Sequence, residues 1–238
     1  MNRLTLTFAN PKLAWRRIIK GSRRLTQIEL FEFEKFMKGK GVILEAGASD
    51  GVDTLKLASF FPNHIVLALE PVLEQFTETT RTTSRFSNVR TFNLALSSQS
   101  GIAKLHIGKS GAGLSGMGSS SLLKPKEHLL EFPEIDFSEI RTVETVTLED
   151  FCESHNVEFI DLLWLDVQGA ELNVLLQNPG VVKRIVRAIH LEISRKELYE
   201  GAPIYKDVVR VLNDLDFEIV IDRVGRLSGN VFAVNKHI

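Results

Sequence analysis

The sequence predicts an α/β fold with a mostly parallel sheet that closes in an antiparallel hairpin. From Val42 onward, short apolar runs alternate with helical patterns, which is typical of βαβ units. The last two apolar runs, "FEIVIDR" and "NVFAVNK", are separated only by "VGRLSG", which is too short for a parallel crossover. A length of 238 residues with 44% hydrophobic content indicates one soluble globular domain with a small attachment.

The expected elements follow from these runs. We expect strands at 42–45, 65–69, 89–94, 103–107, 143–147, 160–166, 185–193, 218–222 and 231–235. Helical patterns cover 53–61, 72–84, 148–155, 170–178 and 203–215. Residues 41–238 therefore form the α/β domain, and residues 1–40 form a basic, helical N-terminal extension.

The extension is basic because seven Lys or Arg residues precede the first acid, Glu29. This arm could contact a membrane surface weakly. Its second half predicts an amphipathic helix that ends at the glycines near 40 and packs on the domain. The packing residues that we expect are Leu25, Ile28, Phe31 and Phe36.

Composition limits the classes of partner and location. A formal charge of -1 gives no overall attraction to nucleic acid, so a small-molecule or glycan partner is favoured. No apolar run approaches the roughly 18 residues of a transmembrane helix. The single cysteine, Cys152, excludes an intramolecular disulfide, and we interpret it as a buried structural thiol in a cytoplasmic protein.

The first candidate site is the glycine-rich turn after the first strand, "EAGASDG". Gly47 and Gly51 are spaced as G-x-x-x-G, which differs from the G-x-G-x-x-G dinucleotide fingerprint. Gly47 and Ala48 would let a ligand approach the backbone closely. Asp50 either accepts a hydrogen bond from a ligand ammonium or caps the following helix.

Further polar residues stand where later strands end, and ligands of doubly wound sheets bind at this edge. Glu70, followed by Pro71, ends the second strand and could accept two ribose hydroxyls, or it could cap the next helix. Asn93 and Ala95 end the third strand, where they would flank an adenine, although Asn93 could equally stabilise a turn.

The strand "IDLLWLDV" delivers Asp166 to the same edge, while Asp161 at its other end should face solvent. On the neighbouring strand, His190 and Glu192 are two residues apart and share one face. Asp166 and Glu192 could together hold a divalent cation, or they could bond directly to sugar hydroxyls.

A loop rich in Gly and Ser, residues 108–121, is long enough to serve as a lid or substrate loop. Its last residues, Ser119, Ser120 and Ser121, would then lie near the reaction centre. The acid-rich segment 126–140 forms either a substrate wall or a solvated connector. Arg195, Lys196 or Tyr199 could add to that wall.

The ordered set of motifs resembles the FkbM family of S-adenosylmethionine-dependent methyltransferases. The motifs are "ILEAGASDGVDT", "LEPV", "NLALSSQSG", "GMGSSSL", "VTLEDF", "IDLLWLDVQGAELNVL" and "IHLEIS". The resemblance implies a Rossmann-like class I methyltransferase fold, with a mostly parallel seven-stranded sheet, the C-terminal antiparallel hairpin and a small inserted β segment. Three positions depart from the family pattern: Glu45, Ser49 and Gln168.

The resemblance implies methyl transfer from S-adenosylmethionine to a hydroxyl of a glycan, polyketide or other secondary metabolite. The implied cofactor residues are Glu45, Gly47, Ala48, Asp50, Glu70, Pro71, Asn93, Ala95 and Asp166. The candidate bases are Asp166 and His190. The implied substrate residues are Ser119, Ser120, Ser121, Gln168 and Glu192.

Two other hypotheses stay open at this point. An NAD-dependent Rossmann oxidoreductase shares the opening turn and the acid, but its glycine spacing differs. A catalytically silent carbohydrate-binding protein would bind sugar without releasing a methyl group.

Overall fold

The computed structural model describes residues 27–37, 39–110 and 117–238. Within these residues, the main sheet has seven strands in the order β3-β2-β1-β7-β8-β10-β9. Its strands are β1 (Gly41–Ala46), β2 (His64–Leu69), β3 (Val89–Phe92), β7 (Ile160–Leu165), β8 (Val186–Ser194), β9 (Phe217–Val224) and β10 (Ser228–Asn235). The strands from β3 to β8 pair in parallel, whereas β10 is antiparallel to both β8 and β9. The predicted parallel sheet with a closing antiparallel hairpin is confirmed.

Helices cover both faces of this sheet because its central strands are apolar on both sides. One face packs against α6 (Leu148–His155), α7 (Glu171–Gln177), α8 (Pro179–Ile185) and α9 (Tyr205–Asp214). The other face packs against α2 (Gln27–Glu34) and α3 (Val52–Phe60), and α4 (Leu73–Thr83) lies beside α3 and β3. Successive strand residues alternate between the two cores, so Leu44 joins the first and Ile43 the second.

Helix α2 carries the apolar residues that attach the N-terminal segment to the domain. Leu30 and Phe33 are fully buried and contribute to the core between α2, α3 and the sheet. Phe36 packs partly against that core, but Phe31 is 40% exposed and meets the ring of Phe60 edge-on, at 5.1 Å between ring centroids. The expected packing face was therefore wrong at Phe31. Leu25, the side chain of Ile28 and the basic arm lie outside the described residues, and the domain boundary at 40/41 stays a prediction.

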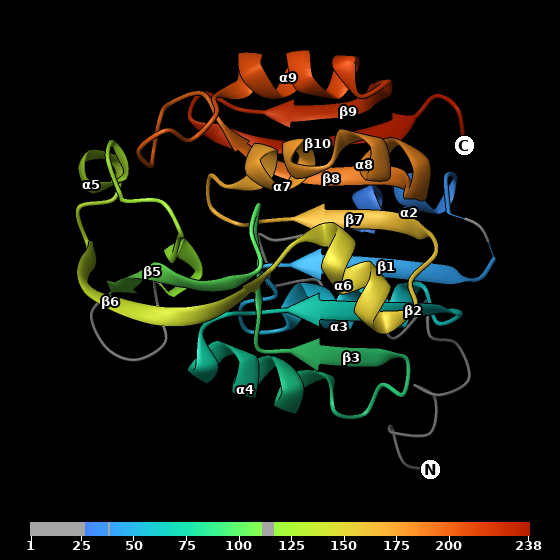
Figure 1. Ribbon diagram of the computed structural model, residues 1–238, viewed down its shortest axis with the longest axis horizontal. Helices are drawn as coiled ribbons and strands as arrows, with labels where there is room; N and C mark the ends of the chain where they lie inside the picture. Colours follow the sequence, from blue (N-terminus) through green and yellow to red (C-terminus); the bar gives the residue numbers. More distant parts are fainter. Residues whose placement is uncertain (1–26, 38, 111–116) are drawn as a thin grey trace, which may run out of the picture.

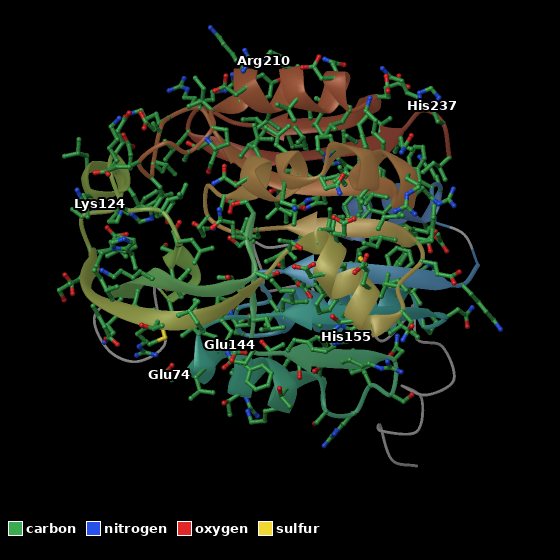
Figure 2. All side chains as sticks on the ribbon, viewed as in Figure 1. Glu74, Lys124, Glu144, His155, Arg210 and His237 are labelled. Atoms are coloured by element: carbon green, nitrogen blue, oxygen red, sulfur yellow. The ribbon has the colours of Figure 1, made fainter. Side chains whose placement is uncertain are left out.

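A second, three-stranded sheet lies beyond the carboxyl ends of the main strands (Figure 1). It contains β4 (Ala95–Leu96), β5 (Gly101–Ser110) and β6 (Ile135–Val146), in the order β4-β6-β5. The predicted inserted β segment is confirmed, but its strands are longer than expected, and the strand expected to reach residue 94 already ends at Phe92. An ion pair of 2.6 Å between Arg141 on β6 and Glu74 on α4 ties this sheet to the domain. Figure 2 labels Glu74 at this junction.

Two segments of the insert, the loop at 108–121 and the acid-rich segment at 126–140, contain more regular structure than expected. Residues 108–110 of the glycine- and serine-rich loop belong to β5, residues 111–116 lie outside the described part, and Met117–Ser119 form a short 3₁₀ helix, η2. The acid-rich segment forms α5 (His128–Glu131) and the first half of β6. Whether this segment serves as a substrate wall or as a solvated connector stays a prediction.

Asp161 is buried, so its expected role as a solvent-facing strand terminator was wrong. It is 2% exposed, and its Oδ1 accepts a hydrogen bond of 3.0 Å from Arg187 Nε on the adjacent strand. His64 Nε2 lies 3.8 Å from Asp161 Oδ2. The carboxylate occupies space that a Cβ at Gly41 would fill, since the two would be 1.4 Å apart. This ion pair lies at the end of the sheet opposite the ligand-binding edge, because Asp161 is the second residue of β7.

Cys152 is a free, buried cysteine on α6, as predicted. Burial raises the pKa of its thiol to about 11, which keeps it protonated and unreactive at neutral pH. In the described part of the chain, no helix is both long and apolar enough to cross a membrane.

Candidate active site

A cavity of about 440 Å³ lies between the carboxyl ends of the main strands and the inserted sheet. Its walls come from the turns after β1, β2 and β7, from β8, and from the insert. The predicted site residues that line it are Glu45, Gly47, Ala48, Glu70, Pro71, Ala95, Ser119, Ser120, Asp166, Gln168, His190 and Glu192. The fold therefore brings most of the predicted residues to one cavity.

The turn after β1 is held tightly against the turn after β7. Gly47 has φ 89°, and a Cβ there would lie 1.9 Å from the carbonyl oxygen of Asp166. The Gly47 N–H donates to Leu69 O at 2.9 Å, and the Asp166 N–H donates to Ala46 O at 3.0 Å. Only glycine fits at this position, because both the left-handed backbone and the close approach exclude a side chain.

Glu70 connects the end of β2 to the turn after β1. Its side chain is 4% exposed, and Oε2 accepts a hydrogen bond of 2.8 Å from the Ser49 N–H. Glu70 Oε1 accepts a hydrogen bond of 2.8 Å from the N–H of Val72, the residue just before α4. Glu70 therefore also acts at the start of this helix, as the capping alternative predicted. Each carboxylate oxygen has a second lone pair that is free for a ligand in the cavity. Burial raises the pKa of Glu70 to about 7.

Two further acids lie on the same wall of the cavity. Glu45 is 1% exposed, and burial raises its pKa to about 8. Its Oε2 has no hydrogen-bond partner among the described residues. Asp53, in the first turn of α3, lines the cavity and pairs with the buried Lys56 at 2.7 Å. An enclosed acidic wall of this kind suits a positively charged ligand group.

In the same cavity, Gln168 bridges two further carboxylates. Its Nε2 donates to Asp166 Oδ1 at 2.6 Å and to Glu192 Oε2 at 3.1 Å. The hydroxyl oxygen of Tyr199 lies 3.1 Å from Gln168 Oε1 and 2.7 Å from Ser119 O, so its single proton is shared between these two acceptors and the shorter contact is to Ser119. Gln168 has φ 53°, a left-handed conformation that costs energy for a residue with a side chain. Burial, followed by the nearby charge of Glu192, holds the pKa of Asp166 well above its usual range.

The turn that carries Gln168 is fixed by Glu171. Glu171 Oε1 accepts hydrogen bonds of 3.1 Å from the N–H groups of both Val167 and Gly169. Burial raises the pKa of Glu171 to about 7. Its contacts hold the turn from within, and Gly169 at φ 97° completes it.

His190 lines the cavity from β8 and stacks on Trp164 of β7, with ring centroids 3.6 Å apart and planes 18° apart. Phe33 of α2 meets the same imidazole edge-on at 5.6 Å. Burial lowers the pKa of His190 to about 3. The imidazole therefore stays neutral at physiological pH and has little affinity for a proton.

Three predicted site residues do not line the main cavity, because each bonds to the backbone of its own neighbourhood. Asp50 Oδ1 accepts from the Val52 N–H at 3.2 Å, next to the start of α3. Asn93 is exposed, and its Nδ2 donates to Glu70 O at 2.9 Å and to Pro71 O at 3.0 Å, so its turn-stabilising alternative holds. Ser121 Oγ donates to Gln168 O at 2.7 Å and supports the Gln168 turn from behind.

Several lining residues were missed in the sequence. The missed polar and aromatic residues are Asp53, Gln75, Trp164 and Asn230, and the missed apolar residues include Leu96, Leu105 and Met117. Asp53 lies one helical turn beyond the recognised glycine turn, so helical spacing could have indicated it. Asn230 faces Glu192 across the β10–β8 register, which is not visible before the strand pairing is known. Of the predicted wall residues on the loop after β8, Tyr199 and Lys196 line a neighbouring cavity, whereas Arg195 stacks over Tyr205 at 4.5 Å.

The cavity is lined by five acidic residues: Glu45, Asp53, Glu70, Asp166 and Glu192. Within the part of the chain that the structure describes, no group of three or more His, Cys, Asp or Glu side chains is arranged to hold a metal ion. Asp166 and Glu192 do lie close together, but the amide of Gln168 donates to both.

Comparisons with known proteins agree with this geometry. Residues 45–219 match the model of the methyltransferase FkbM domain. The chain is 30% identical over 195 residues to the 2-O-methyltransferase NoeI of Sinorhizobium fredii (strain NBRC 101917 / NGR234), covering 82% of this chain and 79% of that protein.

Solved structures resemble the fold at low sequence identity. A precorrin-6y C5,15-methyltransferase from Geobacter metallireducens GS-15 superposes with a TM-score of 0.51 at 10% identity, over 90% of this chain and 92% of that chain. The structure of a fibrillarin/Nop5p complex gives a TM-score of 0.50 at 14% identity, over 84% of this chain and 74% of that chain. With the matched domain covering most of its length, the chain belongs to the FkbM family of S-adenosylmethionine-dependent methyltransferases.

Proposed function

We propose that the protein transfers a methyl group from S-adenosylmethionine to a hydroxyl oxygen of a glycan, polyketide or other secondary metabolite. The observation that carries this proposal is that Glu70 and the bridged pair of Asp166 and Glu192 line one cavity. The first acid suits a ribose, and the second pair suits an acceptor hydroxyl that must lose a proton. The relative named as a 2-O-methyltransferase supports oxygen as the accepting atom.

The chain's own residues fit the cofactor. Glu70 would accept the ribose hydroxyls with its remaining lone pairs, and the methionine part would lie beside Gly47 and Ala48, which line the cavity. We assign the methionine ammonium to the wall of Glu45 and Asp53, in place of the expected Asp50. The apolar residues of the insert side, including Ala95, would enclose the adenine. When bound, S-adenosylmethionine supplies a methyl group on a positively charged sulfur, and its transfer to the acceptor oxygen leaves a neutral thioether.

Asp166 is the residue that we assign as the base. Burial and the nearby charge of Glu192 raise its pKa, which makes the ionised carboxylate a stronger proton acceptor than an exposed aspartate. Gln168 and Glu192 keep the carboxylate in place while the hydroxyl proton moves to it. His190, the other candidate, is a weaker base because burial lowers its pKa to about 3. We therefore assign His190 a packing role against Trp164.

A divalent cation at Asp166 and Glu192 is a second hypothesis for acidifying the acceptor hydroxyl. Such an ion would have to displace the Gln168 amide, which already donates to both carboxylates. Transfer that is unchanged by EDTA would support direct base catalysis, and activity restored by Mg²⁺ after EDTA would support the cation.

The acidic lining also bears on partners and location. Several carboxylates in the cavity disfavour a polyanionic acceptor such as nucleic acid. The single buried thiol supports a cytoplasmic location for the enzyme.

The test uses the purified full chain and methyl-tritiated cofactor. We expect isothermal titration calorimetry to show binding of S-adenosylmethionine, and we expect the label to be transferred to an acceptor. The labelled product should be stable to alkali, because it is a methyl ether. Asp166→Asn should reduce transfer by roughly 10²–10⁴-fold while leaving cofactor affinity within a few fold. His190→Gln is the matched control and should reduce transfer far less. A catalytically silent sugar-binding protein would instead bind saccharide without any transfer.

A further inference from the structure

A second cavity, of about 240 Å³, adjoins the main cavity on the side of the insert. The two cavities share Gly118, Ser119, Gln168 and Glu192 as lining residues. They therefore meet beside Asp166, whose carboxylate is hydrogen-bonded to Gln168. A molecule in the second cavity could reach this carboxylate without crossing the region that we assign to the cofactor.

The outer wall of the second cavity is firmly built. The segment that leads into α5 pairs with the loop after β8, because the Lys126 N–H donates to Leu198 O at 2.8 Å and the Glu200 N–H donates to Lys124 O at 2.7 Å. Lys124, labelled in Figure 2, also forms an ion pair of 2.8 Å with Glu200, and Lys126 pairs with Glu197. These segments are far apart in sequence, so their joining defines a fixed wall rather than a chance gap.

The interior combines an apolar wall with hydroxyl groups. Tyr199, His128 and Phe132 form an aromatic cluster, with His128 at 5.3 Å from Tyr199 and 4.8 Å from Phe132 between ring centroids. The Tyr199 hydroxyl donates to Ser119 O at 2.7 Å, which anchors this wall to the passage between the cavities. Ser194 and Ser228 face each other across β8 and β10 at the opposite side. A ring with C–H faces and several hydroxyls matches such a lining.

Charge and size narrow the ligand further. The lining contains Glu134, Glu171 and Glu192 against one cation, Lys196, which already forms an ion pair with Glu131. A phosphate or sulfate group would therefore be repelled. The volume is smaller than the ~300–1,000 Å³ of cavities that hold drug-sized ligands, so a macrocycle would not enter.

We propose that this second cavity is the acceptor subsite, and that it binds a single uncharged monosaccharide ring at the end of a glycoside or oligosaccharide. One ring hydroxyl passes between Ser119 and Glu192, loses its proton to Asp166 and gains the methyl group. The rest of the acceptor stays outside the wall formed by the α5 segment. This inference rests on the proposed methyltransferase function.

The test fills the cavity without touching the cofactor residues. Ser228→Trp and Ala202→Leu place bulk on two sides of the subsite, and Ser84→Trp on the exposed end of α4 is the matched control. Each variant is checked by thermal unfolding and by calorimetric titration with S-adenosylmethionine. Transfer from methyl-tritiated cofactor is then measured on a panel of neutral p-nitrophenyl hexosides, deoxyhexosides and N-acetylhexosaminides, on UDP-N-acetylglucosamine and on a macrolide aglycone.

We expect the wild type and Ser84→Trp to methylate at least one neutral glycoside. At least one cavity-filling variant should lose this transfer by more than tenfold while its cofactor affinity and unfolding temperature are retained. The saccharide assignment is overturned if the cofactor binds but only the nucleotide sugar or the macrolide is methylated, or no probe at all. It is also overturned if folded filling variants retain transfer. Failure of the proposed function differs from these outcomes, because the wild type would then not bind S-adenosylmethionine.

Discussion

Replacing Glu70 by alanine should weaken the binding of S-adenosylmethionine more than any other single change at the adenosine end of the cavity. Glu70 ends β2, is almost fully buried, and has both carboxylate oxygens oriented by the backbone N–H groups of Ser49 and Val72. The ribose hydroxyls would donate to the remaining lone pairs. The alanine variant loses these acceptors and also frees the turn after β1.

The size of the effect follows from the bonds that are lost. A hydrogen bond to a charged group contributes about 1.5–3 kcal/mol. Loss of two such bonds therefore removes roughly 3–6 kcal/mol of binding free energy, which corresponds to an increase in Kd of about 10²–10⁴-fold. Glu70→Gln keeps one acceptor oxygen, but its amide N–H₂ would face the donor of either Ser49 or Val72. Its loss of affinity should be smaller than that of the alanine variant.

The same residue predicts a pH dependence of affinity. Burial raises the pKa of Glu70 to about 7, so the unliganded protein holds a proton there below pH 7. The ribose hydroxyls need the ionised carboxylate, so binding must release that proton in acid. The Glu70 contribution to Kd should weaken by about tenfold for each pH unit below 7 and level off above it. This contribution should be absent from Glu70→Gln.

Isothermal titration calorimetry between pH 5.5 and 8.5 measures both effects, and thermal unfolding confirms that each variant is folded. Glu78→Gln is the matched control, since it changes an exposed carboxylate on the helix that follows and breaks only its contact with Arg81. An alanine variant at position 70 that binds the cofactor within twofold of the wild type would refute the assignment of Glu70 to the ribose.

Three other changes probe separate parts of the site. Gln168→Leu removes the hydrogen bonds that the Gln168 amide donates to Asp166 and Glu192, so kcat should fall by roughly 10–10³-fold. The acid limb of the kcat pH profile should move to higher pH, whereas the Kd of the cofactor should stay unchanged. The unliganded protein should lose thermal stability as the pH rises from about 4.5 to about 8 and level off above that, because native Glu45, with a pKa of about 8, keeps its proton where the unfolded chain has lost it. Glu45→Gln should flatten this slope, and an unchanged slope would contradict the assignment. Asp161→Ala leaves the buried guanidinium of Arg187 without its carboxylate partner, so the free energy of unfolding, measured in urea, should fall by about 3–5 kcal/mol. A change below about 1 kcal/mol would show that the Asp161–Arg187 ion pair contributes little.

The sequence predicted the residues whose position depends only on the order of strands. Glu70 and Asp166 each follow an apolar strand, and parallel strands end at the same edge, so their meeting at one cavity could be expected. The closing hairpin was equally predictable, since six residues cannot form a parallel crossover.

Other features depend on contacts that the sequence does not display. Asp161 looked like a solvated strand end, but its partners, Arg187 and Gly41, come from the two neighbouring strands and are distant in sequence. The same holds for Asn230, which reaches the cavity only through the pairing of β10 with β8. Long-range pairing, rather than local pattern, decides these positions.

The insert illustrates a different difficulty. Residues 135–146 form one long strand with partly buried and exposed residues in alternation. The period is hidden in the sequence because Ile140 lies on the exposed face, whereas Glu139 and Arg141 lie on the partly buried face. Asn93 was ambiguous for a local reason, because a side-chain amide near a strand end can face a ligand or bond to the turn. Only the structure shows which of these two roles Asn93 has.

The most direct test of the account is a pair of calorimetric titrations of the purified full chain at pH 8, one with S-adenosylmethionine and one with NAD. We expect single-site binding of S-adenosylmethionine and no measurable binding of NAD. Binding of NAD without binding of S-adenosylmethionine would contradict the proposed S-adenosylmethionine-dependent methyl transfer.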